Sequence, residues 1–194
     1  MKNTCEKMAS VILIVVLMSM LSGCKAEPVV DEEKVTLTSD ERELYNLIMS
    51  YRAELNLPDI PLSSSLSYVA QQHVADLQEN NPTSSSCNLH SWSDNGSWSA
   101  CCYTNDHTQA SCMWNKPREL TDYNGNGYEI AYYSSTNATP AGALNSWKIS
   151  PGHNNVIINA GNWTLQWKAI GVGIKGRYAV VWFGHEDDPA GPPG

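Results

Sequence analysis

The chain has 194 residues, with 20 acidic side chains against 12 basic ones and a net charge of −8 at pH 7. This length fits one domain with a sizeable hydrophobic core. No basic stripe is present to neutralise phosphates, so the composition argues against nucleic acid as a partner.

The first 23 residues predict a signal peptide, and the next residue predicts a lipid anchor. Basic residues precede an apolar run over residues 9–21, which is too short for a comfortable membrane span. The run ends in Leu21-Ser22-Gly23-Cys24, which resembles the bacterial lipobox, where the cysteine sulfur receives a diacylglycerol. We expect Cys24 to hold the mature chain to a membrane. An ordinary secretory signal with an incidental cysteine is the alternative.

The mature chain begins with a predicted flexible tether over residues 24–37, which is polar and acidic and contains a proline. Removal of the signal takes away two basic side chains and one acidic side chain, which leaves 10 basic and 19 acidic ones. Lys25 rather than aspartate follows Cys24, and by the sorting rule of enteric-type bacteria this favours the outer membrane over the inner one. We therefore expect a lipid-anchored protein of the bacterial cell envelope.

Four cysteines remain in the mature chain beyond Cys24, and they predict two disulfides. An even number of cysteines within 26 residues of an exported chain is typical of a disulfide framework. A bond between the neighbours Cys101 and Cys102 would close a strained small ring, so we expect each of them to pair with either Cys87 or Cys112. A cysteine-based zinc site is the alternative, although the segment has no Cys-x-x-Cys pair.

Two amphipathic helices are predicted in the first part of the domain. Thr38 and Glu41 match a capping box, apolar residues follow at helical spacing, and Pro58 ends the helix. A second helix begins near residues 63–65 and carries its own apolar stripe. His73 lies inside that stripe, where we expect a hydrogen-bonded core histidine.

Residues 80–127 predict a long irregular segment held together by the disulfides. The segment is rich in Ser, Asn, Asp and Gly and contains Trp92, Trp98 and Trp114. Loops of this length in compact domains are usually functional. The three rings could stack on a sugar or lipid ligand, or they could pack as a small satellite core under the disulfide loops.

The last third of the chain predicts one helix and several strands. Residues 128–135 read as a strand or a short helix, and residues 139–150 as a helix with Thr139 as its cap. Strands are predicted over residues 153–159, 167–176 and 178–184, the last two joined by a hairpin-like turn. Residues 186–194 are acidic and rich in Pro and Gly and predict a loose tail. The order of elements predicts an α+β domain over residues 38–185 with a small antiparallel sheet.

Several motifs together resemble the CAP superfamily, the group of cysteine-rich secretory proteins, antigen 5 and plant pathogenesis-related 1 proteins. They are the opening helix "LYNLIMSYRAELNLP", the segments "NLHSWSDNG" and "GNGYEIAYYSS", the pattern "W…SPGH", and the closing strands "IGVGI…YAVVWFG". The resemblance covers about residues 37–184. It implies a three-layer α-β-α sandwich with a cleft that is lined by two histidines and two acidic residues.

The resemblance also implies which residues form the site. His90 matches the first family histidine, His153 the second, and Glu129 the glutamate of a Gly-Glu-Asn motif, shifted by one place. The second family glutamate falls on Ser150, so at most three of the four groups are present. In several members the histidine pair holds zinc or another divalent metal, which makes His90 and His153 candidate metal ligands here. His153 is expected at the joint between a turn and a strand.

Three functions remain open at this point. The first is a non-enzymatic module that binds a small ligand, lipid, sugar, protein or divalent metal at His90, Glu129 and His153. The second is a hydrolase of the protease type that uses the same groups, although no serine is marked as a nucleophile and no Gly-x-Ser-x-Gly elbow is present. The third is a purely structural module of the envelope.

Overall fold

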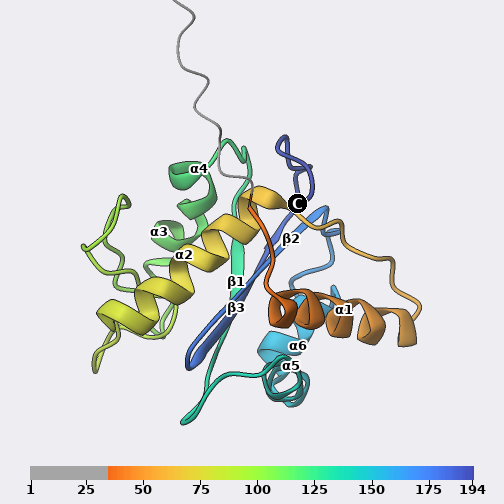
Figure 1. Cartoon of the computed structure of the whole chain (residues 1–194), viewed down its shortest axis with the longest axis horizontal. Helices are drawn as coiled ribbons and strands as arrows, with labels where there is room; N and C mark the ends of the chain where they lie inside the picture. Colours follow the sequence, from red (N-terminus) through yellow and green to blue (C-terminus); the bar gives the residue numbers. More distant parts are fainter. Residues whose placement is uncertain (1–34) are drawn as a thin grey trace, which may run out of the picture. The chain divides into compact units, whose positions relative to one another are not determined.

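A computed structural model describes residues 35–194, which form a three-stranded sheet with helices on both faces (Figure 1). The predicted signal peptide, Cys24 and most of the predicted tether lie outside the described residues. Within residues 35–194, none of the helices combines the length and the hydrophobicity that a bilayer crossing requires. The elements in chain order are α1 (Ser39–Glu54), α2 (Ser64–Asn80), α3 (Ala110–Trp114), α4 (Lys116–Leu120), β1 (Tyr128–Tyr133), α5 (Pro140–Ile149), α6 (Pro151–Ile157), β2 (Ala169–Lys175) and β3 (Tyr178–Gly184).

The predicted helix starts are confirmed by their caps. The Glu41 amide donates to the Thr38 hydroxyl at 3.2 Å, and the Thr38 amide donates to the Glu41 carboxylate at 2.9 Å, which completes the capping box of α1. Ser63 caps α2 and Thr139 caps α5 without a capping box: each side-chain oxygen accepts one hydrogen bond from a backbone amide of the first turn. These caps satisfy amide groups that have no partner within the first turn of a helix.

The sheet has the order β1-β3-β2 and both pairs of strands are antiparallel. The central strand β3 is buried along its whole length, so it must supply apolar side chains to both faces. Ala179, Val181 and Phe183 point into one core, and Val180 and Trp182 point into the other. This alternation follows from the two-residue period of a β-strand.

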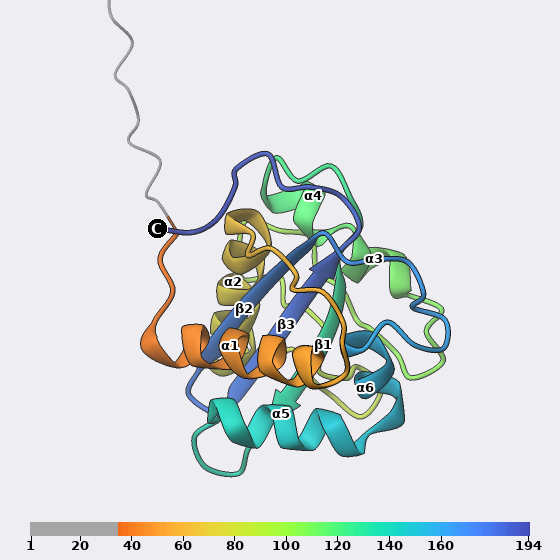
Figure 2. The ribbon, with the colours of Figure 1, turned by 90° about the vertical axis from the view of Figure 1, so that its right-hand side faces the viewer.

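Each face of the sheet is covered by its own group of helices. Helices α1, α5 and α6 pack on one face, which is the side turned toward the viewer in Figure 2. Helix α2, with α3 and α4 beside it, covers the opposite face. The expected α+β fold with helices on both sides of a small antiparallel sheet is therefore confirmed.

One predicted strand, over residues 153–159, is wrong: residues 153–157 are helical, and residues 158 and 159 form a turn. Helix α6 begins at Pro151, which is favourable in the first turn of a helix, with Ser150 as its cap residue. Val156 and Ile157 face the core from its last turn, and the Val156 carbonyl accepts a bond from the Trp167 indole at 2.8 Å. His153 accordingly lies in the first turns of a short helix and not at the joint between a turn and a strand. The ambiguous segment after residue 127 is a strand, β1.

The predicted irregular segment over residues 80–127 contains two five-residue helices, α3 and α4, between its loops. Two disulfides cross-link it, Cys87–Cys102 and Cys101–Cys112. The prediction that the two neighbouring cysteines pair with different partners is confirmed. Cys101 is buried and pairs with Cys112 in α3, whereas Cys102 is exposed and pairs with Cys87 in the loop after α2.

The tail after residue 185, for which the composition predicts a loose segment, is hydrogen-bonded to the domain. The Asp188 carboxylate accepts from the Ser63 hydroxyl at 2.6 Å and from the Ser65 amide at 2.9 Å. It therefore lies at the start of α2, where a negative charge is stabilised by the exposed amides and the helix dipole. Gly191 adds a backbone bond from the Ser64 amide at 2.8 Å.

Candidate functional site

Glu129 lies at the centre of a buried chain of polar groups. It enters the domain from β1, and both of its carboxylate oxygens meet a histidine. Oε1 lies 2.5 Å from Nδ1 of His73 on α2, and Oε2 lies 2.7 Å from Nδ1 of His90 in the loop that follows. The side chains of Glu129 and His73 have no exposed surface, and that of His90 is 19 % exposed. Glu129 thus joins a core histidine to a histidine that reaches the surface.

The electrostatics of this chain favour an ionised carboxylate. Burial raises the pKa of Glu129, but the charges and hydrogen bonds of His73 and His90 act in the opposite direction and leave the pKa below its ordinary value. The effect extends to the phenol of Tyr103, whose pKa is raised by burial and by the negative charge on Glu129. Tyr103 contacts His90 edge-on, with 5.2 Å between the ring centroids.

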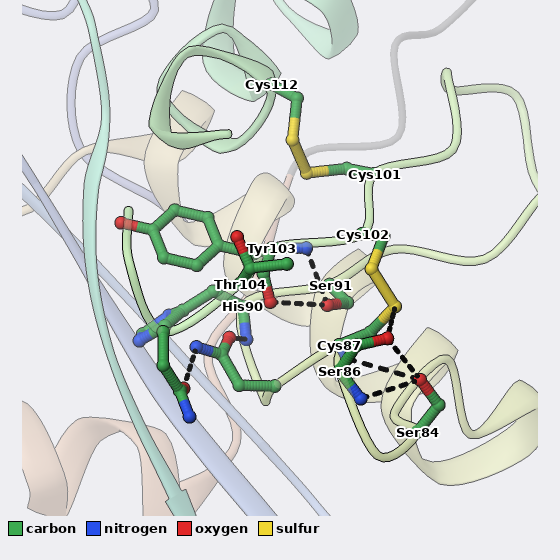
Figure 3. Close-up of a disulfide and its surroundings, with 12 residues drawn as sticks. Ser84, Ser86, Cys87, His90, Ser91, Cys101, Cys102, Tyr103, Thr104 and Cys112 are labelled. Carbon is green, nitrogen blue, oxygen red and sulfur yellow. Dashed lines mark hydrogen bonds between the residues drawn. A yellow bond between two sulfur atoms is a disulfide. The ribbon is translucent and has the colours of Figure 1, made fainter. Parts of the chain in front are cut away.

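The loop that carries His90 is held in place on both sides. The His90 amide donates to the Asn88 side chain at 3.0 Å. The Tyr103 amide donates to the Ser91 hydroxyl at 2.9 Å, which ties the residue after His90 to the neighbouring loop. Figure 3 shows His90 and Ser91 next to Tyr103, with the two disulfides on the same segment. The disulfides therefore help to position His90 as well as cross-linking the loop.

His153 is partly buried in α6, and its ring is fixed by its own helix. Nδ1 lies 2.8 Å from the hydroxyl of Ser150, the residue at the position of the missing family glutamate. Burial lowers the pKa of His153, and a protonated His90 nearby would lower it further. The ring is therefore neutral near pH 7, and its nitrogen lone pair is available.

The structure thus joins two of the three predicted site residues directly. Glu129 and His90 share a hydrogen bond, whereas His153 bonds to neither of them. In both His90 and His153 the Nδ1 atom is engaged, and within residues 35–194 neither Nε2 atom has a hydrogen-bond partner. These two nitrogens are the groups that the site can offer to a ligand.

A divalent metal fits this arrangement only in part. A metal-bound histidine usually donates its second ring nitrogen to a carboxylate or another oxygen, as His90 does to Glu129, and Nδ1 of His153 likewise lies against an oxygen, the Ser150 hydroxyl. Glu129 cannot add a third ligand without giving up one of its histidines. Among the His, Cys, Asp and Glu side chains of residues 35–194, no three are arranged as a metal-binding group. If a divalent ion binds here, His90 and His153 would supply two imidazole nitrogens and water would supply the other ligands.

His73 is the site residue that sequence reasoning missed. The prediction of a hydrogen-bonded core histidine is confirmed, but its partner is the site carboxylate, 56 positions away in the chain. Its ring stacks on Trp92 at 4.3 Å with only 6° between the planes. Trp92 is itself buried, and Trp98 and Trp114 pack against the same core, which favours the satellite-core interpretation of the three loop tryptophans. The position of His73 in the apolar stripe of α2 does not indicate that it pairs with Glu129.

The comparisons with known proteins agree with this fold. The profile of the Cysteine-rich secretory protein family matches residues 45–176, well over half of the chain. No curated protein sequence matches the chain closely enough to be reported as a relative. Three of the similar solved structures are bacterial proteins, all below 25 % identity, so they show the fold alone.

The first is an outer surface protein from Borrelia burgdorferi, with a TM-score of 0.54 and 22 % identity over 79 % of this chain and 98 % of that one. The second is an extracellular protein containing a SCP domain from Bacillus anthracis, with a TM-score of 0.54 and 19 % identity over 78 % of this chain and 45 % of that one. The third is a cysteine-rich secretory protein from Staphylococcus aureus, with a TM-score of 0.50 and 15 % identity over 80 % of this chain and 40 % of that one.

The chain spans less than half the length of the second and third of these proteins, and almost all of the first. The matched range, residues 45–176, contains the positions of His73, His90, Glu129 and His153. Together with the sheet and its two helical layers, this match shows that the chain belongs to the cysteine-rich secretory protein family.

Proposed function

We propose that this protein is a non-enzymatic binding module of the bacterial cell envelope, anchored by a lipid at Cys24. Its ligand-binding groups are the Nε2 atoms of His90 and His153. The ligand that this pair recognises is a divalent transition metal such as zinc, held weakly and exchangeably because the chain supplies only two nitrogens. Further ligands, which this chain does not supply, complete the coordination shell of the metal.

One observation carries this proposal: both histidines are oriented through Nδ1, and both are left with Nε2 available. His90 faces a carboxylate with Nδ1, so that nitrogen carries the proton and Nε2 holds the lone pair. His153 is held neutral by burial, with its Nδ1 on Ser150. Neutral imidazoles with an oriented second nitrogen are the state in which histidine binds transition metals.

A hydrolase is the second candidate, because the Ser150 hydroxyl lies 2.8 Å from His153 and could act as a nucleophile beside a base. A catalytic base of this kind needs a third group that orients it. Glu129, the carboxylate of the site, does not serve in that role, because its two oxygens bond to His73 and His90. The geometry therefore favours binding over nucleophilic catalysis.

Zinc titration of the purified protein by calorimetry tests the metal site. We expect weak binding with one ion per chain. His90→Ala and His153→Ala should each lower the affinity by at least the ~10–100-fold that the loss of an outer-shell partner alone costs. His107→Ala is the matched control, because His107 is an exposed loop histidine, and its affinity should equal that of the wild type. No uptake by the wild type, or equal losses in all three variants, would reject the proposed site.

Metabolic labelling with a palmitate analogue tests the anchor. We expect label on the wild-type protein and none on Cys24→Ser, because the sulfur of Cys24 is the predicted acceptor. The other cysteine outside the disulfides, Cys5, lies in the predicted signal peptide, and Cys5→Ser is the matched control that should keep the label. Equal labelling of wild type and Cys24→Ser would contradict lipidation and leave an ordinary secretory signal.

A further inference from the structure

His73 is a fully buried imidazole between two hydrogen-bond acceptors. Nε2 lies 3.0 Å from the backbone carbonyl of Ser91, and a carbonyl can only accept. Nε2 therefore carries a hydrogen. Nδ1 faces Glu129 Oε1 at 2.5 Å, so one further proton lies between these two atoms.

That shared proton can sit on His73, which makes an imidazolium paired with a carboxylate, or on Glu129, which makes two neutral groups. The stacking partner favours the first state. The imidazole lies flat over the indole of Trp92, and a cation over a tryptophan face is stabilised by the negative face of the ring system. The fully buried pair is neutral as a whole, so no uncompensated charge is buried.

The consequence reaches His90 through the second oxygen of Glu129. With His73 as the donor to Oε1, the carboxylate has no proton of its own to give, and Oε2 can only accept. Nδ1 of His90, 2.7 Å away, must then be the donor. The proton of neutral His90 is thus placed on Nδ1, and its Nε2 keeps the lone pair.

We propose that His73 is a positioning residue, which as a buried imidazolium holds Glu129 in its acceptor-only form and thereby fixes the tautomer of His90. This inference rests on the proposed function, because the lone pair that it places on His90 Nε2 is the group offered to a ligand. No direct contact between His73 and the ligand is involved. The effect passes through one carboxylate and two hydrogen bonds.

Nitrogen NMR of the histidine rings in the full-length protein at pH 7 reads these proton positions directly. In the wild type we expect His73 to carry a proton on both nitrogens and His90 to carry one on Nδ1 alone. A His73 ring with a single proton, or a His90 ring with its proton on Nε2, would overturn the proposal. This result does not depend on whether any metal binds.

Two variants then test the direction of the effect. In His73→Phe the stacking on Trp92 is kept but the buried carboxylate loses its donor. Glu129 must then take up a proton and donate it in a hydrogen bond to His90 Nδ1, which moves the proton of neutral His90 to Nε2, or it stays ionised beside a doubly protonated His90. In either case Nε2 of His90 gains a proton, and zinc affinity falls as for His90→Ala. Unchanged His90 nitrogen signals in this variant would refute the positioning role.

Glu129→Gln keeps the shape of the side chain and removes its charge. The Nε2 hydrogen of His73 stays on the Ser91 carbonyl. The side-chain NH₂ of the new glutamine then donates to His73 Nδ1, which must be unprotonated, so His73 becomes neutral. We expect the ring to lose one proton relative to the wild type, and an unchanged ring would contradict the inference. This variant keeps the test available if His73→Phe does not fold.

His185→Phe is the matched control for both. His185 stacks on Trp167 at 4.1 Å in the same flat manner as His73 on Trp92, but its Nδ1 bonds to the Gln166 carbonyl. The His90 signals should be unchanged in it. If wild-type zinc binding is absent while the nitrogen signals behave as expected, the proposed ligand is wrong and the role of His73 stands.

Discussion

Replacing Gly171 by alanine should destabilise the protein by about 3 kcal/mol, at the upper end of the range for overpacked cores. A Cβ at this position would lie 2.0 Å from the backbone carbon of Leu66 and 2.3 Å from its oxygen. Leu66 lies in the first turn of α2, and hydrogen-bonded backbone atoms of a helix cannot move aside as a flexible side chain can. Helix α2 rests directly on β2 at this glycine, so the added methyl must push the two elements apart.

The same contact recurs one strand period later. A Cβ on Gly173 would lie 2.5 Å from the backbone of Ala70, three residues before His73. The two glycines thus set the height of α2 above the sheet and with it the distance between His73 and Glu129. We therefore expect Gly171→Ala to disturb the His73 ring signals as well as the stability.

Denaturant unfolding followed by tryptophan fluorescence measures the loss, and Gly152→Ala is the control. A Cβ at Gly152 in α6 meets no atom within 4 Å, and alanine is the better helix former by up to about 1 kcal/mol. Its free energy of unfolding should equal or exceed that of the wild type. Similar midpoints for the two alanine variants would show that α2 can shift without cost.

The helix starts and the two paired C-terminal strands could be predicted because their signals are local. Thr38 and Ser63 cap their helices through residues three positions on, and β2 and β3 are joined by a short hairpin turn at Gly176, whose positive φ of 55° suits glycine. Such features lie within a few residues of one another, so the sequence carries them without knowledge of the fold.

Helix α6 was mispredicted because its apolar run is too short to show a period. Three consecutive apolar residues fit a buried strand or the last turn of a helix equally well. The segment becomes helical because Val156 and Ile157 pack into the core beneath α1 and α5, which is a tertiary contact. The proline at position 151 was the one local sign of a helix start.

The site was predictable only as far as the family resemblance reaches. It points to His90, Glu129 and His153, and the structure brings the first two into contact. Nothing in the sequence marked His73 as a site residue, because every core residue of α2 lies in the same apolar stripe. The partner that gives it a role comes from β1 on the facing sheet, and that pairing depends on how closely the helix approaches the strand.

Arg52→Met should cost about 2–3 kcal/mol, because it leaves buried carbonyl groups without a donor. The Arg52 guanidinium is 1 % exposed and donates to the Pro58 carbonyl twice, at 3.1 and 2.9 Å. It also donates to the Ile157 carbonyl at 2.5 Å and to the Asn159 side chain at 2.9 Å. Methionine fills a similar volume and supplies none of these four bonds.

We expect the loss of these hydrogen bonds to destabilise the C-terminal end of α6. Ile157 is the last residue of that helix, and the final carbonyls of a helix have no partner within it. A positive charge at the C-terminal end of a helix also interacts favourably with the helix dipole. Burial lowers the pKa of the Arg52 guanidinium, while the nearby Asp59 carboxylate acts in the opposite direction. The fourfold hydrogen bonding is what makes a buried cation acceptable here.

Arg42→Met is the matched control, because Arg42 lies on the same helix α1 and is exposed. A surface substitution of this kind should change the free energy of unfolding by no more than about 0.5 kcal/mol. Hydrogen exchange separates the local effect from the global one. In Arg52→Met the amides of the last turn of α6 should exchange faster than those of α2, and the ring signals of His153 should shift with them. Equal stability of the two variants, or exchange that rises uniformly through the domain, would show that Arg52 does not hold α6 and that His153 is positioned by Ser150 and the core alone.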